Sequence, residues 1–152
     1  MRFKASAPDA AYERFCSDEA WWLDGFALFT AIRNDLSGWG WSDWPEELRD
    51  RQPEVSRATQ DKLSDRVETE KFLQYLFFKQ WKGIKQYCNQ KEIQIIGDIP
   101  IYVNDDSADV WMNPELFKLD AQKNLQSLPA CRLIISAGPA SVGAIPSTVG
   151  TL

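Results

Sequence analysis

The aromatic residues of this 152-residue chain stop abruptly, and this break most constrains what the chain can fold into. All seven tryptophans, four tyrosines and eight phenylalanines lie at or before Phe117. From Asn124 to Leu152 there is no aromatic residue, and Arg132 is the only charged one. Large aromatic side chains supply much of the buried area of a core. We therefore expect a folded part over residues 1–123 and a tail without packed structure over residues 124–152.

Apolar residues at helical spacing predict two long helical stretches in the folded part. The first covers residues 9–34, and the second covers residues 57–90 with an interruption. Between them, the tryptophan-rich segment 39–44 breaks the periodicity because Gly38, Gly40 and Pro45 lie in or beside it. The β-branched run 93–96 then predicts a short buried strand. A long helix followed by a buried strand is typical of α/β folds.

Charge and composition exclude several classes of function. A net charge of −5 gives no basic face for nucleic acid, and no apolar run is long enough to span a membrane. With no histidine, the chain cannot build a serine or cysteine catalytic triad, and we expect no metal and no cofactor. Three widely spaced cysteines and the absence of a signal peptide favour a soluble cytoplasmic protein. Any chemistry would then have to use carboxylates.

A set of motifs in fixed order indicates a family. Upstream motifs are Glu19-Ala20-Trp21-Trp22-Leu23-Asp24, Trp44-Pro45 and Lys71-Phe72-Leu73-Gln74-Tyr75-Leu76-Phe77-Phe78. Downstream motifs are Gly97-Asp98-Ile99-Pro100-Ile101-Tyr102-Val103, Asp106-Ser107-Ala108-Asp109-Val110-Trp111 and Asn113-Pro114-Glu115-Leu116-Phe117. Over residues 10–120 the chain resembles the amylomaltases, or 4-α-glucanotransferases.

The resemblance implies a fold and an activity. Amylomaltases are (β/α)8 barrels with inserted helical subdomains, so we expect an α/β fragment of a larger barrel: a partial (β/α)8 barrel with a helical insertion. The family transfers α-1,4-glucan segments between maltooligosaccharides or starch-type glucans by a retaining double displacement. That mechanism needs an aspartate nucleophile and a glutamate acid roughly 5 Å apart. Both family motifs are absent here, so we expect the chain alone to be inactive.

Three residues are candidates for substrate binding. Asp98 ends the predicted strand and is a candidate active-site carboxylate. The resemblance implies that its role is to hold an arginine beside the nucleophile, and a solvated strand-end or turn aspartate is the alternative. Tyr102 and Trp111 are candidates for stacking on sugar rings, with plain packing as the alternative. The aspartates of segment 105–109 lack the spacing of a calcium loop. A stand-alone carbohydrate-binding or interaction module that uses exposed aromatics, such as those of segment 39–44, is the alternative function.

The tail is interpreted as an out-of-frame translation. After Asn-Pro-Glu-Leu-Phe the family continues with a loop like Ala-Gly-Val-Pro-Pro-Asp-Tyr-Phe-Ser, then Thr-Gly-Gln and Trp-Gly-Asn-Pro-Leu-Tyr. Synonymous codons can be chosen from Leu128 onward so that the neighbouring frame encodes this whole sequence. We place the slip at Lys123-Asn124, in a run of adenines that lost one base. An unrelated natural linker is the alternative, and a pseudogene, a programmed slip and a sequencing error stay open as origins.

A fragment of a barrel is expected to leave apolar surface uncovered. The stripe Leu73, Phe77 and Trp81 would lose part of its covering, and the run 93–96 would present unpaired backbone. We therefore expect a marginally stable chain that tends to associate.

Overall fold

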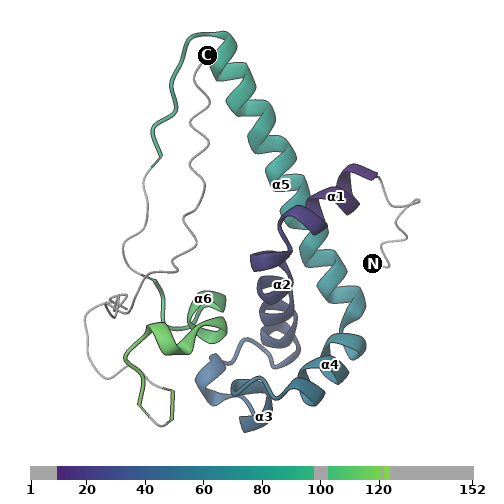
Figure 1. Ribbon diagram of the computed structural model, residues 1–152, viewed down its shortest axis with the longest axis vertical. Coiled ribbons are helices and arrows are strands. Elements are labelled where there is room, and N and C mark those ends of the chain that lie inside the picture. Colours follow the sequence, from purple (N-terminus) through teal and green to yellow (C-terminus); the bar gives the residue numbers. More distant parts are fainter. Residues whose placement is uncertain (1–9, 98–102, 121, 124–152) are drawn as a thin grey trace.

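A computed structural model of the chain describes residues 10–97, 103–120, 122 and 123 (Figure 1). The helical elements among these residues are α1 (Ala10–Asp18), α2 (Ala20–Asp35), η1 (Trp41–Asp43), α3 (Glu46–Arg49), α4 (Pro53–Lys62), α5 (Ser64–Gln90), α6 (Ala108–Met112) and η2 (Pro114–Leu116), where η denotes a 3-10 helix. In the described ranges no strand is present, although Val103 and Leu119 are single β-bridge residues.

Helix α2 is the centre of the described fold. It packs against α5 on one side and against α6 on another, as Figure 1 shows. Its apolar residues are spread around the helix, and Leu23, Ala27 and Ile32 are at most 1% exposed. A helix that is apolar on several faces must be covered on each of them. The core contains residues from α2, the η1 segment, the α4–α5 junction and the α6–η2 segment: Ala27, Phe29, Ala31, Ile32, Trp41, Trp44, Leu63, Val67, Ala108, Val110, Trp111 and Phe117.

Both predicted helical stretches are confirmed, each with a break. The first stretch divides at Glu19 into α1 and α2, and the second divides at Leu63 into α4 and α5. The second break lies at Leu63, whose side chain is buried (5% exposed). Part of the tryptophan-rich segment forms the short helix η1. In the segment, Trp41 and Trp44 are each 3% exposed, whereas Trp39 is 61% exposed. Two of these three indoles therefore serve packing.

Aromatic rings join α1 to α5. Tyr12 contacts Phe72 and Tyr75 edge to face, with ring centroids 5.8 and 5.5 Å apart. Phe15 contacts Tyr75 and Phe78 at 5.7 and 5.2 Å. Aromatic pairs at these separations add about 0.5–1.5 kcal/mol each beyond the area they bury. The short helix α1 is therefore held mainly by rings from α5.

The predicted barrel fragment is not visible in the described part of the chain. Residues 93–97 are irregular and form no strand, and the Ile93, Ile95 and Ile96 side chains are 54%, 41% and 94% exposed. A strand is stable only when neighbouring strands pair with its backbone and a second layer covers its face. The described residues supply neither. The prediction of a buried strand at residues 93–96 is therefore wrong for this chain, and the fold described is helical.

The second half of α5 extends beyond the helices that pack against it, as the upper part of Figure 1 shows. Trp81 in this half is 42% exposed, and Leu73 and Phe77 in the first half are 50% and 59% exposed. The expectation that this apolar stripe would be uncovered is confirmed. Each large apolar side chain that stays in water lacks the roughly 1.5–3 kcal/mol of stabilising free energy that its burial would provide.

Helix α5 ends at a residue whose backbone suits glycine better than glutamate. Glu92 has a φ of 59°. The Ile93 amide donates to the Cys88 carbonyl at 2.9 Å, which is the long hydrogen bond of a Schellman helix end. A non-glycine residue in this left-handed region costs roughly 1–2 kcal/mol.

Replacing Glu92 by glycine is therefore expected to stabilise the helical part by about 0.5–1 kcal/mol, after the entropy cost of glycine is subtracted. The measurement is the urea midpoint followed by circular dichroism. The matched control is Glu92→Ala, which removes the same charge but keeps the Cβ, and it should not stabilise. Equal midpoints for the two variants would contradict the expectation.

Candidate functional site

The motif-rich segment 103–117 packs on the central helix α2. Ser107 starts α6, and its hydroxyl accepts a hydrogen bond from the Val110 amide at 3.4 Å, which is the usual N-cap arrangement. Within this segment, Val110 and Trp111 are 0% and 2% exposed. Phe117 follows η2 and is 8% exposed. The segment therefore contributes to the core and is not a loose surface loop.

Trp111 lies in a cluster of three aromatic rings. Its ring centroid is 5.7 Å from that of Phe29 on α2 and 5.7 Å from that of Trp44, and the Phe29 and Trp44 centroids are 5.3 Å apart. The Trp111 indole N–H donates to the Leu48 carbonyl at 3.1 Å, and the Arg51 guanidinium lies 5.7 Å from the ring centroid. Within this chain Trp111 is a core residue. Its contact with a sugar ring stays a prediction.

The loop before α6 is fixed to α2 and η1 by polar contacts. Arg33 Nη2 lies 2.7 Å from Asp106 Oδ2. The other carboxylate oxygen of Asp106 accepts from the Trp41 amide at 3.3 Å, and the Trp41 indole N–H donates to the Asp105 carbonyl at 2.7 Å. We call this group of four residues, Arg33, Trp41, Asp105 and Asp106, the latch. It joins positions more than sixty residues apart in the chain.

The Arg33–Asp106 pair is expected to be coupled by about 0.5–1 kcal/mol, because both side chains are only partly exposed and Asp106 has a second donor. A double-mutant cycle with Arg33→Ala and Asp106→Asn measures this coupling in urea. The pair Lys62–Asp35 is the control and should show less coupling, because its lysine is 70% exposed and Arg66 also pairs with Asp35 and replaces part of the lost interaction. Equal coupling in the two pairs would contradict a special role for the latch.

The other two candidate residues, Asp98 and Tyr102, lie outside the described residues, so their roles stay predictions. In the described ranges no group of three or more potential metal ligands occurs. Asp106 belongs to the latch. Sequence reasoning missed Arg33 and the Leu48 carbonyl, because nothing in the spacing of residues connects α2 or α3 with segment 103–117.

The groups with a perturbed pKa lie on α1 and α5 and at the end of α3, where Leu48 and Arg51 contact Trp111. Burial raises the pKa of Tyr12, and hydrogen bonds with Cys16 and Glu68 raise it further. Burial also raises the pKa of Glu70 on α5. The hydrogen bond from Arg49 lowers the pKa of Asp50 at the end of α3. These shifts follow from local packing and pairing around the helices.

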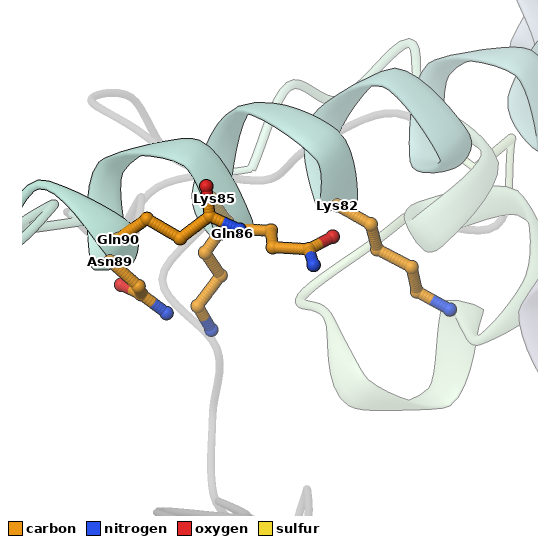
Figure 2. A pocket seen from close by; sticks show the side chains of 5 residues that line it. All are labelled: Lys82, Lys85, Gln86, Asn89 and Gln90. Carbon is orange, nitrogen blue, oxygen red and sulfur yellow. The ribbon is translucent and has the colours of Figure 1, made fainter.

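Two open hollows lie along α5. A groove of about 570 Å³ between α1 and α5 has Phe15, Glu19, Tyr75 and Phe78 among its lining residues. The Glu19 carboxylate already has a hydrogen-bond partner, since it accepts from the Trp22 indole N–H at 2.7 Å. The second hollow, of about 510 Å³, lies on the outer half of α5; Figure 2 shows its lining residues Lys82, Lys85, Gln86, Asn89 and Gln90.

A family model of the 4-alpha-glucanotransferases matches residues 1–149. The chain belongs to the 4-alpha-glucanotransferase family. It is 43% identical over 117 residues to the 4-alpha-glucanotransferase of Clostridium butyricum, covering 77% of this chain and 24% of that protein. It is 42% identical over 112 residues to the enzyme of Thermus thermophilus, covering 74% of this chain and 22% of that protein.

A solved structure of a 4-alpha-glucanotransferase relative has the same local fold. The amylomaltase from Streptococcus agalactiae in complex with acarbose superposes with a TM-score of 0.69 and 41% identity, covering 74% of this chain and 23% of that chain. The chain thus spans about a quarter of the length of its relatives. The family match extends into residues 124–149. The out-of-frame interpretation of the tail therefore stays a prediction, which the nucleotide sequence around Lys123 tests. In the described part, no helix has both the length and the apolar character that a bilayer span requires.

Proposed function

We propose that this chain is a segment of a 4-alpha-glucanotransferase and that the complete enzyme transfers α-1,4-glucan segments between maltooligosaccharides or starch-type glucans. The observation that carries the proposal is the match of residues 1–149 to the family, together with 36–44% identity to curated members. Family membership does not favour the alternative of a stand-alone carbohydrate-binding module.

Within the complete enzyme the described residues supply support for the site. A retaining transfer needs a carboxylate that attacks the anomeric carbon and an acid that protonates the leaving oxygen. The chain has no histidine and therefore no Arg-x-Asp-His nucleophile motif. What it does supply is a helical layer on which segment 103–117 is held by the latch and by Trp111. Asp98, Tyr102 and Trp111 remain the proposed substrate-side residues of that enzyme.

The test is to restore the reading frame at Lys123, express the complete reading frame that results, and incubate the product with maltotriose. We expect glucose and longer maltodextrins, since each transfer shortens one oligosaccharide and lengthens another. The Thermus thermophilus enzyme serves as the positive control. A folded, complete enzyme that forms no transfer products would contradict the proposal. Glucan binding by the 152-residue chain, with no transfer by the complete enzyme, would favour the stand-alone module instead.

A further inference from the structure

The groove between α1 and α5 combines an aromatic floor with a rim of charged side chains. Phe15 of α1 contacts Tyr75 and Phe78 of α5, with ring centroids 5.7 and 5.2 Å apart, and all three rings line the groove. Its volume of about 570 Å³ lies within the range of roughly 300–1,000 Å³ that is usual for ligand sites. The groove therefore has room for a small molecule that lies against the rings.

The groove lies on the other side of α5 from the exposed apolar stripe. At about 100° per residue, Lys82 and Tyr75 lie roughly 140° and 160° around the helix from Phe77. On the groove side, Lys79 and Lys82 are exposed. Lysines are almost never fully buried unless they are paired. This side of the helix is therefore suited to water and to a polar solute.

The rim of the groove carries hydrogen-bonding groups of both kinds. Arg14, Lys79 and Lys82 can only donate, whereas the carboxylates of Asp18 and Glu19 can only accept. No ion pair joins Arg14, Asp18 or Lys82 to another residue of the described ranges. These three charged groups are therefore available to a ligand.

Rings and mixed charges together match the surface of a sugar. The C–H groups on one face of a pyranose carry slight positive charge and pack on the negative face of an aromatic ring. Each sugar hydroxyl both donates and accepts, so it can use Asp18 as well as Lys82. Lys79 Nζ lies 5.9 Å from the Tyr75 ring centroid, so a donor and a ring can contact the same sugar unit. An anionic ligand would be repelled by Asp18 and Glu19, so a neutral oligosaccharide fits the groove better.

We propose that the groove between α1 and α5 binds a segment of an α-1,4-glucan chain. Sugar rings pack on Tyr75 and Phe78, and their hydroxyls bond to Arg14, Asp18 and Lys82. This inference rests on the proposed function, which supplies the identity of the oligosaccharide. Because the chain has no Arg-x-Asp-His nucleophile motif, binding can be measured on it without turnover.

The test is a calorimetric titration of the 152-residue chain with maltoheptaose. The double variant Asp18→Ala/Lys82→Ala should bind about tenfold more weakly than the wild-type chain, because it removes charge-assisted hydrogen bonds to the sugar. The matched control Glu13→Ala/Lys85→Ala makes the same charge changes on the same two helices, at exposed positions that do not line this groove. It should bind like the wild-type chain. Circular dichroism verifies that each chain is folded.

Equal affinity of the two double variants for maltoheptaose would overturn the proposal. A folded wild-type chain that does not bind maltoheptaose, or that binds glucose 1-phosphate more tightly, would also overturn it. Failure of the proposed function gives a different result. In that case the complete enzyme forms no transfer products from maltotriose, whereas failure of the groove alone leaves that transfer intact.

Discussion

Incubated with maltotriose, the purified 152-residue chain is expected to produce no glucose and no longer maltodextrins above a protein-free blank. The retaining route requires a carboxylate to form a covalent glycosyl-enzyme intermediate and an acid to assist departure of the leaving group. Neither family motif occurs in the sequence. Because the covalent step itself is missing, the expected loss is complete, and binding energy alone cannot replace it.

The measurement is product separation by chromatography over a long incubation. The 4-alpha-glucanotransferase of Thermus thermophilus, added in trace amount to a parallel sample, shows that the assay conditions support transfer. Products that scale with the concentration of the 152-residue chain and remain after further purification would contradict the expectation. They would also mean that carboxylates of this chain perform the chemistry.

Trp111→Ala is expected to abolish the cooperative unfolding of the chain. The substitution removes a 2% exposed indole that contacts both Phe29 and Trp44. Large aromatic-to-alanine changes in a core cost about 3–5 kcal/mol. The Leu48 carbonyl also loses its indole donor, which adds about 1–3 kcal/mol if the acceptor stays buried. Small domains have a free energy of unfolding of only about 5–15 kcal/mol in total, and this one leaves Leu73, Phe77 and Trp81 largely exposed.

Two further variants separate the causes of this loss. Trp111→Phe keeps a ring in the cluster but removes the N–H, so it should cost about 1–3 kcal/mol. Trp21→Ala makes the same change at a side chain that is 73% exposed, and it should stay within about 0.5 kcal/mol of the wild type. Thermal melts followed by near-ultraviolet circular dichroism give the comparison. A Trp111→Ala chain that melts as the Trp21→Ala chain does would show that the cluster contributes little.

Local sequence patterns predicted the long helices, but they did not predict which helix faces neighbouring elements bury. Phe15, Phe26 and Phe29 recur at helical spacing, and the helices α1 and α2 lie where this spacing places them. The spacing says which side chains share a face. It does not say whether that face meets a neighbour, so the stripe of α5 looks the same in sequence whether it is buried or bare. Only family resemblance, which implied a missing partner, led to the expectation of exposure.

The errors and omissions have equally physical causes. The run 93–96 has high β-propensity, but a strand requires backbone partners from elsewhere in the chain, and the described residues contain none. Helix α6 is too short for a periodic signal, so it depends on the Ser107 cap and on packing over α2. Arg33 and Asp106 are far apart in sequence and meet only because α2 and segment 103–117 pack together. Contacts of this kind follow from the tertiary fold and cannot be inferred from local spacing.

Because the tryptophans differ in burial, they can serve as intrinsic fluorescence and circular dichroism probes. Trp41, Trp44 and Trp111 are 2–3% exposed, whereas Trp21, Trp39 and Trp81 are 42–73% exposed. A soluble quencher such as iodide therefore reaches the exposed indoles but not the buried ones. The close rings of Phe29, Trp44 and Trp111 hold fixed relative orientations, so they contribute ellipticity that disappears when the cluster opens. Trp81 alone reports on the outer half of α5, and its emission shifts to shorter wavelength when that half is covered.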